Sequence, residues 1–60
     1  MPDLKLLAVA QEWRNRTEEA RTRAETFRDP DTKRLMRQVA ATYEEVARRL
    51  EREANRTDKA

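Results

Sequence analysis

The stretch Arg28-Asp29-Pro30-Asp31-Thr32 divides the 60-residue chain near its middle. Proline cannot continue a preceding helix, and its ring pushes the residue before it out of the α-helical region. The same proline suits the first position of a new helix, Asp29 suits the N-cap, and Asp31 favours the positive end of the helix dipole. The stretch therefore predicts the end of one helix, a hinge at 28–31 and the start of a second helix.

Apolar and small side chains recur at steps of three and four on both sides of this hinge, which is the spacing of one helix face. Before the hinge they are Leu6, Ala10, Trp13, Thr17, Ala20, Ala24 and Phe27. After it they are Met36, Val39, Tyr43, Val46 and Leu50, with Ala40, Ala47 and Ala54 along one flank. We expect helices over about residues 4–27 and 30–55, and a frayed tail at 57–60.

So short a connection forces two long helices to run antiparallel. Facing residues of an antiparallel pair have numbers with a constant sum, and the two rows satisfy this with sums of 59 or 60. The predicted pairs are Phe27–Thr32, Ala24–Met36, Ala20–Val39, Thr17–Tyr43, Trp13–Val46 and Ala10–Leu50. Most pairs set a large residue against a small one, as close packing requires. The sequence therefore predicts one all-α domain, an antiparallel two-helix hairpin.

The composition agrees with this fold and narrows the chemistry. Glycine is absent and 43% of the residues are charged, which is typical of long helices. Cysteine, histidine and serine are also absent, which excludes thiol nucleophiles, Ser–His triads and thiolate or imidazole metal sites. Without glycine there is no phosphate-binding loop of the P-loop type. We expect no catalytic residue, no cofactor and no metal site, and a protein that is not an enzyme.

The short chain favours self-association. A core of this size contributes roughly 3 to 5 kcal/mol, and neither disulfides nor metal can add to it. We expect a lone hairpin to leave the alanine row half exposed, and two hairpins to cover it by forming a four-helix bundle. The predicted interface residues are Trp13, Leu35, Ala40, Tyr43, Ala47 and Ala54. A monomer whose alanines are covered by arginine stems, and a helix of an unidentified partner protein on the same row, are the alternatives.

Most of the charged residues are explained by ion pairs along one helix, which stabilise the helix itself. Glutamate precedes arginine by four positions, the favourable orientation, in Glu12–Arg16, Glu19–Arg23, Glu44–Arg48 and Glu45–Arg49. The hinge end departs from this balance, because basic residues outnumber acidic ones there. Its candidate phosphate-binding residues are Arg21, Arg28, Lys33, Arg34 and Arg37. A solvated surface is the favoured interpretation, and contact with nucleic acid or an anionic surface is the alternative.

Thr17 is the one polar residue in the first row, and the predicted register places it opposite Tyr43. Its hydroxyl group either contacts Tyr43 and fixes the register, or bonds to the backbone four residues earlier. The sequence leaves both interpretations open.

Residues 12–50 also carry a pattern that runs from Trp13-Arg14-Asn15-Arg16, through Asp29-Pro30, to Tyr43-Glu44-Glu45-Val46-Ala47. This pattern resembles that of short uncharacterised bacterial proteins that form helical hairpins. The resemblance implies a natural bacterial origin and the hinge, and it implies no activity.

The longest apolar run is Leu6-Leu7-Ala8-Val9-Ala10, too short for a membrane-spanning helix or a signal-peptide core. We therefore expect a cytoplasmic protein without a membrane span. The predicted function is that of a small self-associating helical bundle, serving as a structural or protein-interaction module.

Overall fold

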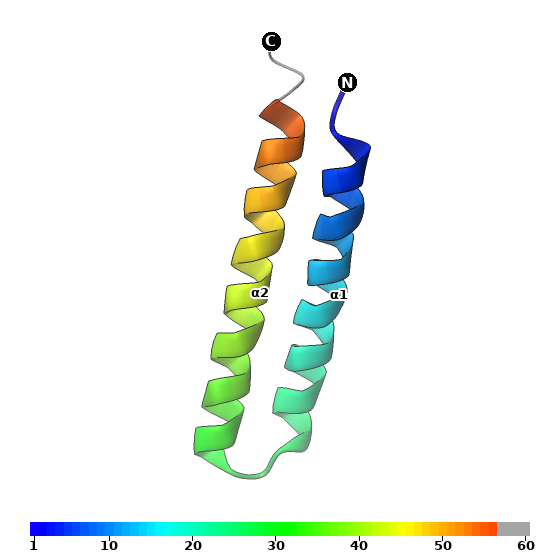
Figure 1. Ribbon diagram of the computed structural model, residues 1–60. Helices are drawn as coiled ribbons and strands as arrows, with labels where there is room; N and C mark the ends of the chain where they lie inside the picture. Colours follow the sequence, from blue (N-terminus) through cyan, green and yellow to red (C-terminus); the bar gives the residue numbers. More distant parts are fainter. Residues whose placement is uncertain (57–60) are drawn as a thin grey trace.

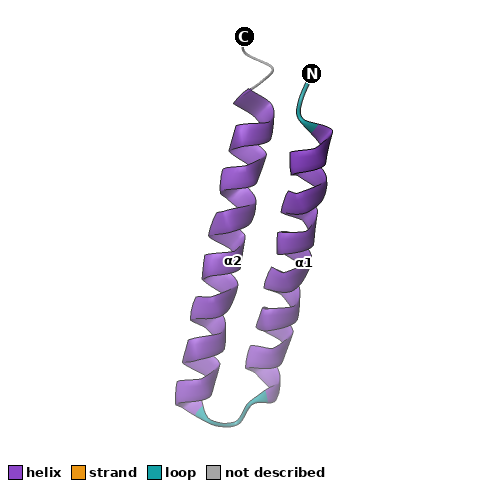
Figure 2. Ribbon diagram, in the orientation of Figure 1, coloured by secondary structure: helices purple, strands orange, loops and turns teal. Residues whose placement is uncertain are grey.

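A computed structural model of the chain describes residues 1–56, which form an antiparallel hairpin (Figure 1). Helix α1 spans Leu4–Thr26 and helix α2 spans Pro30–Arg56, and the loop 27–29 joins them (Figure 2). The predicted all-α helical hairpin is confirmed. Helix α1 ends one residue earlier than expected and α2 ends one residue later. The predicted fraying of residues 57–60 lies outside the described residues.

Asp29 starts α2 as an N-cap. Its Oδ2 accepts hydrogen bonds from the backbone N–H of Thr32 at 2.9 Å and from the Thr32 hydroxyl group at 2.7 Å. Its backbone carbonyl accepts from the N–H of Lys33 at 3.0 Å. The bond from the Thr32 hydroxyl group is the main reason that the pKa of Asp29 lies below its ordinary value. The loop is thus held by Asp29 and Pro30, the residues that mark it in the sequence.

Asp3 starts α1 in the same way. Its Oδ1 accepts from the N–H groups of Lys5 and Leu6 at 3.0 and 3.2 Å. The N–H of Asp3 donates to the carbonyl of Ala54 at 3.0 Å, so the beginning of α1 is tied to the end of α2. Sequence reasoning missed this cap, although an aspartate directly before an apolar run is the usual signal for one.

The core of the hairpin is a line of small side chains, which we name the small-residue seam. Each member has an exposed fraction of 4% or less: Ala10, Thr17, Ala20 and Ala24 in α1, and Ala40, Ala47 and Ala54 in α2. No large side chain of the described residues is fully buried. Small residues seven apart follow one side of a helix and let two backbones approach closely. The Cα atoms accordingly span only 48 × 13 × 9 Å.

The expectation that Ala40, Ala47 and Ala54 would lie half exposed is wrong. Helix α1 covers all three, and their exposed fractions are 2% or less. The reason is steric, because the helices approach each other along the line of least side-chain volume. The larger row of α2, expected at the centre, is displaced to one flank, where its members are half-buried. These are Met36, Val39, Tyr43, Val46 and Leu50.

Contacts on both sides of the seam define the register. Trp13, expected opposite Val46, packs its ring against Tyr43, and the numbers of this pair sum to 56. On the other side Arg14 pairs with Glu51, and these numbers sum to 65. The predicted sums of 59 or 60 lie between these two values. This is expected for residues at the seam, which lies between the two pairs.

Thr17 follows the second of its two interpretations. Its hydroxyl group donates to the carbonyl of Trp13, four residues earlier, at 2.9 Å. The side chain is 3% exposed, so this bond supplies the partner that a buried hydroxyl group needs. Thr17 therefore serves as a small residue of the seam.

Candidate interaction surfaces

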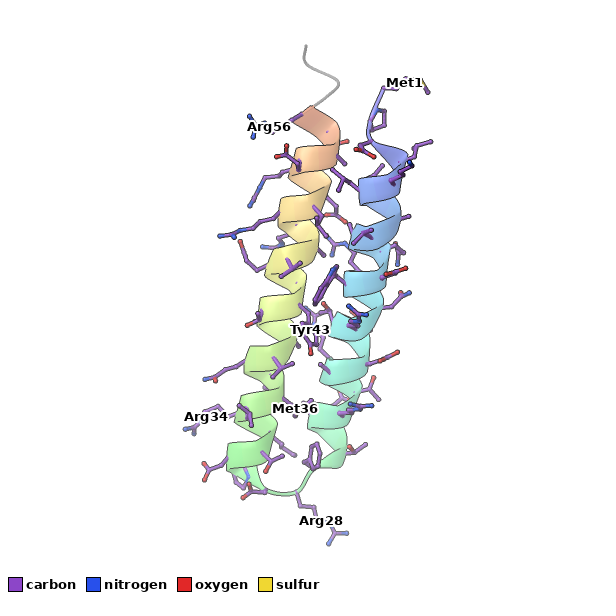
Figure 3. The ribbon with its side chains drawn as sticks, viewed as in Figure 1. Met1, Arg28, Arg34, Met36, Tyr43 and Arg56 are labelled. Atoms are coloured by element: carbon purple, nitrogen blue, oxygen red, sulfur yellow. The ribbon has the colours of Figure 1, made fainter. Side chains whose placement is uncertain are left out.

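Large apolar side chains gather on one side of the seam, which we name the apolar side. Its centre is the contact between Trp13 and Tyr43, whose ring centroids lie 5.5 Å apart with the planes inclined by 57°. Residues at helical spacing from these two share the same side. The apolar side consists of Leu6, Val9 and Trp13 of α1, Phe27 of the loop, and Leu35, Met36, Val39, Tyr43, Val46 and Leu50 of α2. Figure 3 shows Met36 and Tyr43 beside the line where the helices meet.

The apolar side remains open to solvent in the single hairpin. Leu35 is 58% exposed, Phe27 is 41% exposed and Val9 is 39% exposed, and the others are half-buried. An open hollow of about 320 Å³ lies beside the apolar side and is lined by residues of α2 alone: Leu35, Gln38, Val39, Thr42 and Tyr43. Exposed apolar side chains that adjoin one another mark a contact surface more often than isolated ones do.

One cation covers part of the apolar side. The guanidinium carbon of Arg16 lies 4.7 Å from the centroid of the Trp13 ring, in a cation–π contact. Arg16 was expected to pair with Glu12, and the described residues show no such ion pair. The α1 edge of the apolar side is therefore basic.

The opposite side of the seam, which we name the ionic side, is closed by ion pairs between the helices. Nε and Nη2 of Arg14 each lie 2.6 Å from an oxygen of Glu51, a bidentate arrangement. Two helical turns after Arg14, Arg21 donates hydrogen bonds to Glu18 at 2.9 Å and to Glu44 at 3.2 Å. Sequence reasoning missed these contacts, although Arg14 and Arg21, and Glu44 and Glu51, are each seven residues apart.

The bidentate pair changes the ionisation of both partners. The hydrogen bond from Arg14 is the largest cause that lowers the pKa of Glu51, and burial opposes it. The same bond raises the pKa of Arg14. Both side chains therefore stay charged over a wider pH range than they would in the unfolded chain.

The predicted helix-supporting pairs form only in part. Glu44 and Arg48 approach within 3.7 Å, as expected. Glu45 lies 4.0 Å from Arg52, and within residues 1–56 it forms no ion pair with Arg49, nor does Glu19 with Arg23. An exposed ion pair at this spacing contributes only about 0.3 to 0.5 kcal/mol, so little stability is lost where it does not form.

Only three of the six predicted interface residues lie on an open surface. Trp13, Tyr43 and Leu35 belong to the apolar side. The three alanines belong to the seam, where α1 already covers them, and they offer no surface to a second hairpin.

The predicted phosphate-binding residues do not converge on one point. Arg21 is held by Glu18 and Glu44 on the ionic side. The remaining four, which we name the hinge-end cations, form no ion pair within residues 1–56: Arg28, Lys33, Arg34 and Arg37. Figure 3 shows Arg28 pointing beyond the loop and Arg34 pointing away from α1. They form a spread basic surface.

A further hollow of about 760 Å³ lies near the end of α2, between residues that include Arg48, Arg52 and Arg56. All its lining residues belong to this one helix, so it is an open space between long side chains. A ligand pocket is enclosed from several sides, and this hollow is not.

No protein-family model matches the sequence, and no match was found among curated proteins or solved structures. Of the part of the chain described here, neither helix is long and apolar enough to cross a membrane. The resemblance to bacterial helical hairpins therefore stays a prediction.

Proposed function

We propose that the protein is a small self-associating helical module, which joins copies of itself or holds a helix of another protein. The observation that carries this proposal is the open apolar side, with Leu35 58% exposed and the Trp13–Tyr43 pair only half-buried. Covering such a surface stabilises a complex by about 25 cal/mol for each square ångström of apolar area. A role in the cytoplasm stays a prediction from the sequence.

The apolar side replaces the alanine row as the proposed contact surface. The alanines are buried within the hairpin, where α1 covers them. Because they occupy the contact between the helices, the larger apolar residues of α2 lie beside it and stay partly exposed. A hairpin with one uncovered apolar side corresponds to one layer of a four-helix bundle, and a second layer of helices would cover that side.

Sedimentation equilibrium from low to high micromolar concentration tests the proposal. We expect a dimer, and we expect Val39→Gln on the apolar side to weaken dimerisation about tenfold. Ala41→Gln is the matched control, because Ala41 is exposed on another face of α2. A monomer of 7.2 kDa at all concentrations would contradict self-association.

Binding of phosphate groups on nucleic acid is the second candidate function. The observation that favours it is the lack of ion pairs at the hinge-end cations, whereas Arg48, Arg52 and Arg56 at the other end of α2 each have one. Cations without a partner in the protein are the ones available to phosphates.

Anisotropy of a labelled DNA duplex, read at low and moderate salt, tests this second candidate. Binding through phosphates weakens as salt rises, and the double variant Arg34→Glu with Arg37→Glu abolishes it. The double variant Arg48→Glu with Arg52→Glu is the control for net charge. Equal loss in both variants, or binding that does not respond to salt, would contradict a site at the hinge end.

A further inference from the structure

We propose that a second copy of the chain covers the apolar side with its hinge at the same end, so that each α1 lies on α2 of the other copy. This inference rests on the proposed self-association and adds the partner and its orientation. It follows from the charges that border the apolar side.

Two hairpins can bury their apolar sides about a two-fold axis in two ways. With the hinges at the same end, α1 of one copy lies on α2 of the other. With the hinges at opposite ends, α1 lies on α1 and α2 lies on α2. Both arrangements bury the same apolar residues, so buried area does not distinguish them. The charged edges do, because like charges in contact oppose association and opposite charges favour it.

The α1 edge of the apolar side is basic. Arg16 and Arg23 follow Val9 at intervals of seven residues, and Lys5 precedes Val9 by one turn. On the α2 edge, Glu53 follows Val39 and Val46 at the same interval. Each α1 edge therefore presents three cations and Glu12, and each α2 edge presents Val39, Val46 and Glu53 together with Arg49.

Opposite charges meet in the same-end arrangement. The facing helices are antiparallel there, and residues at one level have the same number sums as in the hairpin itself. Lys5 of one copy then lies level with Glu53 of the other, and Glu12 lies level with Arg49. Within residues 1–56 neither Glu12 nor Arg49 forms an ion pair, so both charges are available. Among the described residues, Glu53 forms one ion pair, an exposed contact with Arg56 at 3.3 Å.

The opposite-end arrangement mixes like and opposite charges. When α1 overlaps fully with α1 of the second copy, Lys5 lies level with Arg23 and Arg16 lies close to its own counterpart, whereas Glu12 lies level with Arg16. The repulsion between Lys5 and Arg23 has no counterpart in the same-end arrangement, and neither side chain forms an ion pair within residues 1–56 that could offset it. The α2 edges bring only one carboxylate each.

The hollow on α2 also fits the same-end arrangement. It is open, it is lined by Leu35, Gln38, Val39, Thr42 and Tyr43, and Arg23 of the second copy is level with its Leu35 end. The methylene stem of an arginine covers apolar surface while its guanidinium group stays in water. The basic edge of α1 thus closes the most exposed part of the apolar side.

Engineered disulfides test the orientation, since the chain has no cysteine of its own. We compare two double variants. The first combines Lys5→Cys with Glu53→Cys, two positions that the same-end dimer brings together. The second combines Lys5→Cys with Arg23→Cys, two positions that the opposite-end dimer brings together. All three positions are exposed. Within one hairpin neither pair can link, because the first lies on opposite edges and the second is separated by about 27 Å of helix.

In a glutathione redox buffer we expect the first pair to give at least tenfold more covalent dimer than the second pair or any single-cysteine variant. Non-reducing electrophoresis measures this yield. A dimer of the unmodified chain together with linkage of the second pair, or of neither, would overturn the orientation and leave self-association standing. A monomer of the unmodified chain in sedimentation would overturn both proposals.

Discussion

The two sides of the small-residue seam differ in how far one hairpin completes them. On the ionic side, Arg14 and Arg21 of α1 reach Glu51 and Glu44 of α2, so the charges are satisfied within the chain. On the apolar side, Trp13 and Tyr43 touch each other and still remain half exposed. Polar groups reach their partners across a narrow hairpin, whereas apolar groups need a layer of atoms above them. This difference is the reason that we propose the apolar side as the contact surface.

Removing the centre of the apolar side has the largest expected effect. Trp13→Ala should lower the free energy of unfolding by about 3 kcal/mol, because it removes a large apolar group and its ring contact. Thermal denaturation followed by circular dichroism, at fixed protein concentration, measures the loss. A loss below that of the ionic-side variants would reverse the order of the two sides.

Forcing the helices apart affects both sides at once. Ala47→Leu should cost about 2 kcal/mol, since Ala47 is fully buried and the added atoms overfill the seam. The exposed Ala41→Leu is the control, with an expected change within about 0.5 kcal/mol. Equal stability of the two variants would mean that the helices are not in close contact at Ala47.

The ionic side gives a smaller effect that depends on pH. Because the pKa of Glu51 is lower in the folded chain, its ion pair stabilises the fold above the ordinary carboxyl pKa and is lost as the pH falls through the lowered value. Glu51→Gln should thus lower the melting temperature at neutral pH by less than Ala47→Leu does. The difference from the unmodified chain should shrink in acid, and Glu25→Gln, which removes an exposed carboxylate, should show neither effect.

The smallest effect is expected at the cation–π contact. Arg16→Gln should cost about 0.5 kcal/mol, because the guanidinium group covers Trp13 from solvent. Arg34→Gln is the control, because it removes the same charge from an exposed position of α2 that forms no ion pair within residues 1–56. An equal or larger loss for Arg34→Gln in chemical denaturation would show that Arg16 contributes only its charge.

The sequence was sufficient to predict the hairpin, but it did not predict which residues lie between the two helices. Pro30 and the apolar spacing predicted two antiparallel helices, and the predicted number sums lie between those of the two observed side-chain pairs. The same spacing did not reveal that Ala47 and not Tyr43 would lie at the centre, since both rows follow the period of the helix. Close approach of the backbones decides between them, and it depends on all the small residues of both helices together.

The candidate surface was predicted only in part for the same reason. Trp13, Leu35 and Tyr43 were named for the interface, and the structure leaves all three accessible. Whether a second copy covers them stays a prediction. The Arg14–Glu51 pair was missed because sequence spacing along one helix does not show which charges meet across two.

The seam has a consequence for sliding of one helix along the other. Six of its seven residues repeat at intervals of seven, at Ala10, Thr17 and Ala24 in α1 and at Ala40, Ala47 and Ala54 in α2. A shift of one repeat, about 10.5 Å along the axis, would again set small residues against small ones. The seam alone therefore permits more than one alignment. The three-residue loop before Pro30 restricts the helices to one alignment, because it is too short to span a shift of one repeat. A longer loop would permit another alignment.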